Sequence, residues 1–227
     1  MNGMVGDIAG VAVYLDDILI TGTSEDEHAA TVRKVLERLR EAGMKVKVTK
    51  CSFLKPQITY LGHKIDASGI HPTEEKIRAI RDAPIPTNIS ELRAFLGIVN
   101  YYAKFMQNLS STLKPLYELL QKNKPRRWGK KEDEAVKKVK NALSTDTVLV
   151  HYSDTLPLLL ECDASPAGVG AVLSRPVAYA SRCLDPAEKN YAQIDREGLA
   201  LVFGVKKFHQ YLYGRSFELL TDHKPLT

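Results

Sequence analysis

The chain has 227 residues, of which 44% are hydrophobic and 26% charged, and its formal net charge is +5. This balance is ordinary for one large or two smaller globular domains, and it excludes a collagen-like, fibrous or mostly disordered chain. No apolar run approaches the ~20 residues of a membrane span, and the first ten residues do not have the pattern of a secretory signal. Three widely separated cysteines, Cys51, Cys162 and Cys183, favour neither a disulfide scaffold nor a zinc site, and they predict a reducing, intracellular compartment.

The N-terminal part of the chain is predicted to begin with a hairpin and a helix. Residues 11–20 read VAVYLDDILI, which is two short apolar runs on either side of Asp16 and Asp17. This pattern predicts two strands with the acidic pair at or near their turn. Ser24 and Glu27 then have the spacing of a capping box, and apolar residues recur after them at helical spacing.

Two further strands and a small helical unit are expected next. Alternation of apolar and polar residues predicts a half-exposed strand at 44–48, and a β-type run predicts another at 58–65. From 72 to 122 the apolar residues follow a helical period instead. Pro84 and Pro86 separate a first short helix from those that follow, so we expect a compact unit of about three helices.

The segment from Lys122 to Lys140 holds nine basic and three acidic residues around Trp128. It predicts a linker followed by an amphipathic helix at about 131–143, with Trp128 packing that helix. A basic run of this kind can contact nucleic-acid phosphates through salt-sensitive, sequence-independent interactions. It can equally be the solvated face of a linker, and the residues alone leave both interpretations open.

Strand patterns return after Asp154. Residues 156–162 form a near-continuous apolar run, typical of a strand buried on both faces. The other elements expected here are strands at 168–173, 177–181 and 217–220, and one long helix at 188–213.

Two sets of carboxylates are candidates for metal chemistry. Asp16 and Asp17 are adjacent like charges in an apolar segment, which a divalent cation would stabilise, although aspartate is also common in solvent-exposed turns. Asp163 and Asp222 each end a predicted strand, and Glu197 lies at the margin of the apolar stripe of the long helix. If the strands pair and the helix crosses them, these three can converge for two-metal phosphodiester hydrolysis. Taken singly, each is better explained as a turn, cap or helix-surface residue.

Ordered blocks of the sequence resemble the Pol polyprotein of gypsy-class LTR retrotransposons, over nearly all of the chain after about Gly10. Tyr14-Leu15-Asp16-Asp17 is similar to the Tyr-x-Asp-Asp motif of reverse transcriptases. Residues 60–63 (YLGH) are similar to a primer-grip hairpin. Residues 91–97 (ELRAFLG) and 100–102 (NYY) are similar to a thumb. Residues 160–165 (LECDAS) and 221–226 (TDHKPL) are similar to a ribonuclease H domain.

This resemblance implies an α+β fold: a partial polymerase palm plus a helical thumb, followed by an incomplete ribonuclease H-like mixed α/β domain. The implied boundaries are 1–71 for the C-terminal part of the palm, 72–122 for the thumb, 123–155 for a basic connection and 156–227 for the ribonuclease H-like domain.

The resemblance also implies the site residues. Asp16 and Asp17 would be polymerase metal ligands, and Asp163, Glu197 and Asp222 nuclease metal ligands, with Mg²⁺ at both sites. The implied partner is an RNA–DNA hybrid or primer–template, together with the rest of a Pol polyprotein, and no membrane. Residues expected to contact nucleic acid are Tyr60, Leu61, Gly62, Lys124, Arg126, Arg127, Lys130 and Lys131.

Departures from the family pattern limit these expectations. The family's third palm aspartate would precede Met1, so we expect no polymerase activity from this chain alone. Its fourth nuclease aspartate would follow Thr227, so we expect the ribonuclease H-like site of this chain to be incomplete. Leu173-Ser174 runs directly into Arg175-Pro176, which predicts a strained or unpaired hairpin, because proline cannot adopt the positive φ of a two-residue turn. The competing hypotheses are a non-catalytic nucleic-acid-binding remnant of a retroelement and a decayed element without function.

Overall fold

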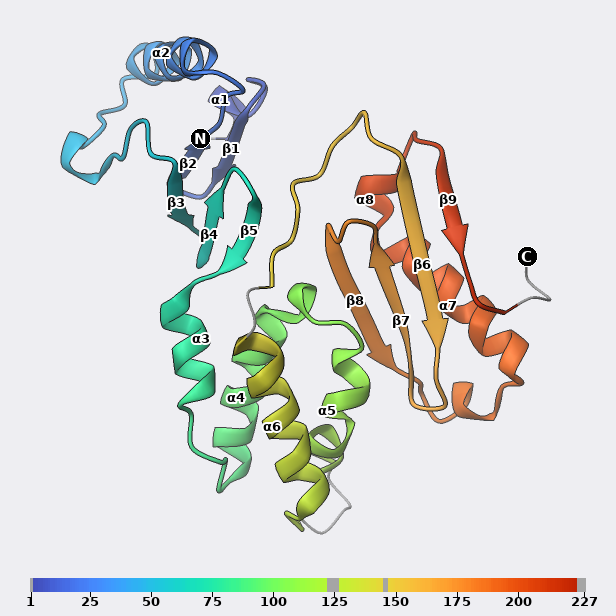
Figure 1. Ribbon diagram of the computed structural model, residues 1–227. Coiled ribbons are helices and arrows are strands. Elements are labelled where there is room, and N and C mark those ends of the chain that lie inside the picture. Colours follow the sequence, from blue (N-terminus) through green and yellow to red (C-terminus); the bar gives the residue numbers. More distant parts are fainter. Residues whose placement is uncertain (1, 122–126, 145–146, 224–227) are drawn as a thin grey trace. The chain divides into compact units, whose positions relative to one another are not determined.

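The computed structural model describes residues 2–121, 127–144 and 147–223 (Figure 1). The chain divides into two compact units, Met1–Tyr60 and Leu61–Thr227, and each is described by itself. None of the helices in the described ranges is both long enough and apolar enough to cross a membrane.

The first unit is built on a hairpin and one long helix. The hairpin strands are antiparallel, with Tyr14 opposite Asp17. Its small core consists of Val5, Ile8, Val35 and Leu39. The elements of this unit are α1 (Asn2–Val5), β1 (Val11–Tyr14), β2 (Asp17–Ile20), α2 (Glu25–Glu41), the 3-10 turn η1 (Val48–Lys50) and β3 (Gln57–Tyr60).

Helix α2 begins where the capping signal predicts. The Ser24 hydroxyl accepts a hydrogen bond from the Glu27 amide at 3.2 Å, and the Glu27 carboxylate accepts one from the Thr23 amide at 2.8 Å. The prediction of a strand at 44–48 is wrong, however. These residues are exposed and irregular as far as η1, and no strand in the described part of the chain pairs with them. Alternation alone could not form a strand, because strand formation requires a partner for its backbone groups.

The second unit begins with a hairpin and a group of helices. The elements are β4 (His63–Asp66), β5 (Gly69–Pro72), α3 (Glu74–Arg81), α4 (Ile89–Tyr101), the 3-10 turn η2 (Ala103–Phe105), α5 (Leu109–Glu118) and α6 (Lys130–Ser144). The strand expected at 58–65 is interrupted, because Leu61 and Gly62 both have left-handed φ values, of 47° and 70°. The segments predicted to form the thumb and the connection share one hydrophobic core. Its buried residues include Leu92 on α4, Leu113 on α5 and Leu143 on α6.

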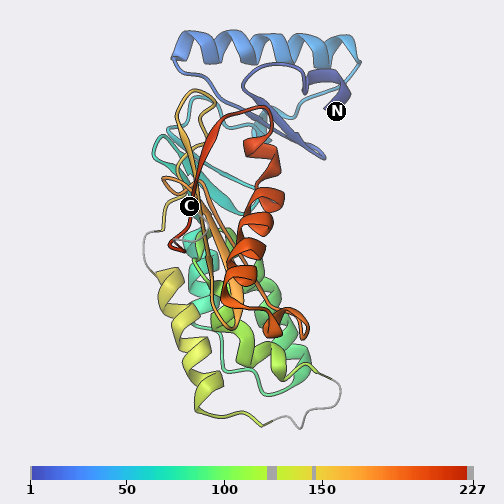
Figure 2. The same ribbon diagram turned by 90° about the vertical axis from the view of Figure 1, so that its right-hand side faces the viewer.

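The C-terminal part of this unit is a four-stranded sheet in the order β8-β7-β6-β9. Strands β6, β7 and β8 are antiparallel neighbours, whereas β9 is parallel to β6. Helix α7 lies along one face of the sheet (Figures 1 and 2). The elements are β6 (Leu158–Ala164), β7 (Gly168–Leu173), β8 (Ala178–Cys183), the 3-10 turn η3 (Glu188–Asn190), α7 (Gln193–Lys207), α8 (His209–Leu212) and β9 (Phe217–Leu220).

Two expectations for this sheet need correction. Burial alternates along the second half of β6, so that Glu161 and Asp163 are exposed on the face opposite α7, and the strand is not buried on both faces. The single helix expected at 188–213 is divided into η3, α7 and α8. Tyr191 and Ala192 adopt extended backbone conformations between η3 and α7, and Phe208, with φ of −100° and ψ of 17°, separates α7 from α8.

The hairpin between β7 and β8 is fully paired, from Gly168 opposite Cys183 to Leu173 opposite Ala178. Its turn contains four residues rather than two, so Pro176 is not required to adopt a positive φ. Arg175 takes the unfavourable conformation instead, with φ of 92°. The expectation of an unpaired hairpin is therefore wrong, whereas the expected strain is present at Arg175.

Candidate metal centre

The fold brings Asp163, Glu197 and Asp222 together at one edge of the C-terminal sheet. Asp163 is the penultimate residue of β6, and Asp222 follows the end of β9. Because these adjacent strands are parallel, their carboxyl ends lie at the same edge, which Glu197 reaches from α7. One carboxylate oxygen from each residue lies within 4.8 Å of the other two.

Glu197 is the unusual member of this acidic cluster, because its side chain is buried with only 3% exposure. The Gln193 side-chain amide donates a hydrogen bond to Glu197 Oε1, and the Arg196 guanidinium donates one to Gln193 Oε1 at 2.7 Å. Glu197 Oε2 has no hydrogen-bond partner among the described residues. A buried carboxylate with a free oxygen beside two other carboxylates is unfavourable, and a hard divalent cation with oxygen ligands would relieve both problems.

A groove with a volume of ≈ 370 Å³ adjoins this cluster and includes Asp163 and Asp222 in its lining. Gln107 and Asn108, which precede α5, also line the groove. Cys162 also lines the groove, but burial raises the pKa of its thiol to about 12, so it is not a nucleophile at neutral pH. The groove therefore combines carboxylates and neutral amides.

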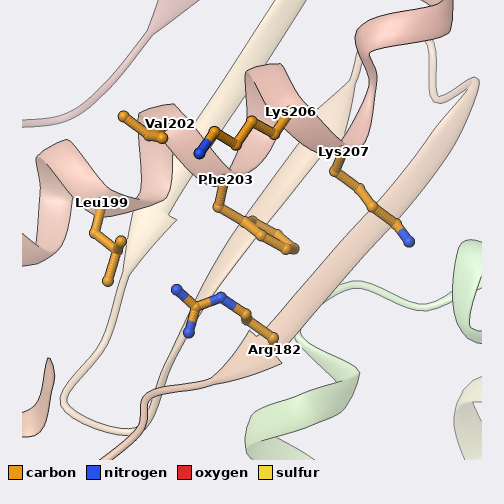
Figure 3. A pocket seen from close by; sticks show the side chains of 6 residues that line it. All are labelled: Arg182, Leu199, Val202, Phe203, Lys206 and Lys207. Carbon is orange, nitrogen blue, oxygen red and sulfur yellow. The ribbon is translucent and has the colours of Figure 1, made fainter. Parts of the chain in front are cut away.

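A second hollow, of ≈ 340 Å³, is lined by cationic and apolar side chains from β8 and α7 (Figure 3). Arg182 lies over the Phe203 ring, 5.7 Å from its centroid, and its guanidinium donates to both Glu188 oxygens at 2.6 and 2.8 Å. These hydrogen bonds lower the pKa of Glu188 to about 2. The lining of this hollow offers no oxygen ligands for a metal, so the acidic groove is the candidate site.

Asp16 and Asp17 lie on the exposed hairpin of the first unit. Leu15, at the turn, is 78% exposed and has a left-handed φ of 52°. Burial, and then the charge of Asp17, raises the pKa of Tyr60 in the same unit. Within the described residues, no further carboxylate, histidine or cysteine completes a metal-binding group with the acidic pair.

Leu61 and Gly62 are held by two tyrosines that follow each other at the end of α4. The Tyr102 hydroxyl donates to the Gly62 carbonyl at 2.9 Å, and the Tyr101 hydroxyl donates to the Leu61 carbonyl. His63 stacks on Tyr101, with their ring centroids 5.3 Å apart. The local sequence carries no signal that these tyrosines fix the turn.

The basic residues predicted to contact nucleic acid are only partly described. Arg127, Lys130 and Lys131 are exposed, whereas Lys124 and Arg126 lie outside the described residues. Trp128 packs against the helical core and donates a hydrogen bond to Asp133 at 2.7 Å, as an anchor would. The described lining of the acidic groove does not include the three exposed cations.

The site also contains residues that the sequence analysis missed. Gln193, which orients Glu197, is one, and Gln107 and Asn108 on the groove wall are the others. The position of Gln193 one helical turn before Glu197 is a usable signal. Gln107 and Asn108 carry no such signal, because they reach the groove only through the packing of α5 on the sheet.

Comparison with protein families and curated proteins gives consistent results. A family described as "Reverse transcriptase (RNA-dependent DNA polymerase)" matches residues 1–65, and one described as "RNase H-like domain found in reverse transcriptase" matches residues 128–219. The Pol polyprotein from transposon 297 of Drosophila melanogaster is 40% identical over 218 residues, which is 94% of this chain and 21% of the relative. The Tf2-3 polyprotein of Schizosaccharomyces pombe is 37% identical over 238 residues, which is 100% of this chain and 18% of the relative.

Solved structures support the same assignment. The foamy viral protease-reverse transcriptase in complex with RNA/DNA hybrid has a TM-score of 0.86 and 25% identity, covering 99% of this chain and 32% of that one. The same viral protein in complex with dsDNA has a TM-score of 0.84 and 25% identity, covering 99% of this chain and 49% of that one. The expected α+β fold, with a reverse-transcriptase part followed by a ribonuclease H-like part, is confirmed. The chain therefore carries a reverse-transcriptase segment followed by a ribonuclease H-like domain of the kind found in reverse transcriptases, and its relatives are retrotransposon Pol polyproteins.

Proposed function

We propose that this chain cleaves the RNA strand of an RNA–DNA hybrid by metal-dependent hydrolysis, with Asp163, Glu197 and Asp222 as the metal ligands. The observation that carries this proposal is the acidic cluster, in which one carboxylate oxygen of each residue lies within 4.8 Å of the other two. Glu197 Oε2 is also buried without a hydrogen-bond partner among the described residues. Since the chain spans only 21% and 18% of the two curated relatives, the activity is argued from its own residues.

The donor set suits Mg²⁺, which is bound in proteins mainly by carboxylate oxygens, water and phosphate. When bound, the metal would activate water and neutralise charge developing on the phosphodiester. The chain's own contribution is to hold the ligands in place. Pairing of β6 with β9 fixes the separation of Asp163 and Asp222, while Gln193 orients Glu197 so that Oε2 remains available.

The nucleic acid is proposed to lie along the groove and to contact cations elsewhere on the chain. The relative solved with an RNA/DNA hybrid supports this type of substrate. We propose phosphate contacts for Arg127, Lys130 and Lys131, with Lys124 and Arg126, and backbone contacts at Tyr60, Leu61 and Gly62. The division into palm (1–71), thumb (72–122), connection (123–155) and ribonuclease H-like domain (156–227) remains part of the proposal.

Asp16 and Asp17 are proposed as polymerase metal ligands in the complete polyprotein. Two carboxylates without a third cannot hold both metals in polymerase geometry, so we expect no templated nucleotide incorporation by the 227 residues alone. Extension of a primer by the purified chain with Mg²⁺ and all four dNTPs would refute this part of the proposal.

The test of nuclease function uses the full chain and a hybrid with a labelled RNA strand. We expect cleavage that requires Mg²⁺, is absent from Asp163→Asn and is unchanged in Glu218→Gln, which removes an exposed carboxylate on β9 outside the groove lining. Cleavage that persists in Asp163→Asn would come from another enzyme and would contradict the proposal. Salt-sensitive binding without cleavage would favour the non-catalytic remnant, which the exposed Arg127, Lys130 and Lys131 would suit.

A further inference from the structure

Asn108 occupies the N-cap position of α5 without performing the usual function of that position. An N-cap asparagine ordinarily has an extended backbone and accepts a hydrogen bond from the first turn of its helix. Asn108 instead has a left-handed φ of 51°, and within the described residues its side chain makes no capping hydrogen bond. Asparagine adopts this left-handed region more readily than most residues, and because the side chain is exposed and does not cap the helix, its amide group is available to contact a ligand.

The amide of Asn108 lies over Gly170 of β7. A Cβ atom at Gly170 would be 2.5 Å from Asn108 Oδ1, so only glycine leaves room for this side chain. Gly170 is the cross-strand partner of Asp163. Because directly opposite residues project from the same face of a sheet, Asn108 lies above the face that carries Asp163.

The start of α5 is fixed on this face by small residues of the sheet. The Ser110 amide donates to Ser181 Oγ at 3.0 Å, and the Cys183 thiol donates to the Ser110 carbonyl at 3.3 Å. A Cβ atom at Gly168 would lie 3.2 Å from Ser110 Oγ. These contacts hold Asn108 in a defined position on the groove wall, and Gln107 beside it is exposed on the same wall.

We propose that Asn108, assisted by Gln107, is a specificity-determining residue that contacts the ribose edge of the RNA strand in the groove. This inference rests on the proposed nuclease function. The carboxylates hold metal and do not distinguish ribose from deoxyribose, whereas an amide offers both a donor and an acceptor to a 2′-hydroxyl. Being neutral, the amide adds no further negative charge beside the acidic cluster.

The experiment measures binding of the full chain to a labelled RNA–DNA hybrid and to a DNA duplex of the same sequence. Ca²⁺ replaces Mg²⁺ so that neither substrate is cleaved during the titration. The variant Asn108→Gly removes the amide at a backbone conformation that glycine tolerates, and Gln107→Ala tests its neighbour. Gln210→Ala, an exposed amide on α8, is the matched control.

We expect Asn108→Gly to reduce the preference for hybrid over DNA about three- to tenfold, the range for loss of one hydrogen bond, with DNA binding unchanged. Gln107→Ala is expected to reduce the preference less, and Gln210→Ala not at all. Gly170→Ala provides a second route to the same loss, because its Cβ would displace the Asn108 amide while leaving Asn108 itself in place.

An unchanged preference in both Asn108→Gly and Gly170→Ala, with hybrid cleavage by the wild type intact, would overturn this inference alone. A wild type that binds hybrid and DNA equally would also overturn it. A wild type that neither binds nor cleaves the hybrid would refute the proposed function and this inference together. If Asn108→Gly does not fold, judged by its circular dichroism melt, Gly170→Ala decides the question.

Discussion

Gly204 on α7 lies directly against Cys162 on β6, and a Cβ atom at Gly204 would be 2.6 Å from the cysteine Sγ. The same Cβ would lie 3.1 Å from the Ala171 Cβ on β7. The helix therefore approaches the sheet as closely as a residue without a side chain permits. This approach brings Glu197, two turns earlier on α7, to the edge where β6 and β9 end.

Two glycines of α7 are predicted to respond in opposite ways to alanine. Gly204→Ala should lower the free energy of unfolding by about 1–3 kcal/mol, because the added methyl overpacks the contact with Cys162. Gly198→Ala should raise it by about 0.5–1 kcal/mol, because among the described residues nothing lies within 4 Å of the new Cβ and alanine is the better helix former. Urea unfolding of both variants measures the difference, and equal effects would show that α7 does not pack as described.

Removal of the buried charge at Glu197 is predicted to stabilise the metal-free protein while eliminating cleavage. Glu197→Gln keeps the size of the side chain and ends the repulsion with Asp163 and Asp222, so we expect the free energy of unfolding to rise by about 1–2 kcal/mol in EDTA. The control Glu218→Gln should change it by less than about 0.5 kcal/mol. Destabilisation by Glu197→Gln in EDTA would indicate that the carboxylate has a structural partner instead.

The strained turn between β7 and β8 offers a stabilising substitution. Arg175 has φ of 92°, a conformation that disfavours any residue with a Cβ atom. Arg175→Gly should relieve about 1–2 kcal/mol of strain and lose about half of that gain to the greater freedom of the unfolded chain. Thermal denaturation should therefore show a higher melting temperature, and a lower one would mean that the arginine side chain makes a compensating contact.

His63 is predicted to make the second unit sensitive to mild acid. Burial, and then the charge of Lys104, lowers the pKa of His63 to about 4. The unfolded histidine has a pKa near 6.5. Protons therefore bind preferentially to the unfolded state between these values, and stability should be constant above pH ~6.5 and fall as the pH approaches 4. Because the ring is partly exposed, we expect a loss on the order of 1 kcal/mol between pH 7.5 and 5.

The variant His63→Phe keeps an aromatic ring against Tyr101 and removes the titrating group. Chemical denaturation at several pH values should give a shallower decline for this variant than for the wild type. Asp66, whose pKa is lowered by hydrogen bonds from Ser68 and His71, titrates below this window and affects both proteins alike. Identical slopes would contradict the half-buried position of His63.

Local signals in the sequence predicted helix starts well. Ser24 caps α2 by accepting a hydrogen bond from the Glu27 amide at 3.2 Å, as the capping-box spacing predicts. The helical stripe that includes Leu92 and Val99 is buried as expected. Such features depend on residues three or four positions apart, so they can be recognised directly in the sequence. The prediction of a strand at 44–48 was wrong because strand pairing depends on a distant partner, which the alternation of apolar and polar residues does not specify.

The site was predictable only in part for the same reason. Asp163, Glu197 and Asp222 were named from strand ends, helix periodicity and family resemblance. Their convergence depends on the parallel pairing of β6 with β9 and on the close packing at Gly204. Asn108 could not be found from sequence, because its place on the groove wall depends on Gly170 and on the docking of α5 against β8.

The most direct test of whether Asp163, Glu197 and Asp222 form one metal centre is binding of Mn²⁺. This ion is paramagnetic and accepts the same oxygen ligands as Mg²⁺. Electron paramagnetic resonance of the full chain measures the bound fraction during a titration. A metal centre formed by these three residues predicts Mn²⁺ binding by the wild type, by Glu218→Gln and by an Asp16→Asn/Asp17→Asn double variant, and loss of that binding in Asp163→Asn. Equal binding by the wild type and Asp163→Asn, or none by the wild type, would contradict it.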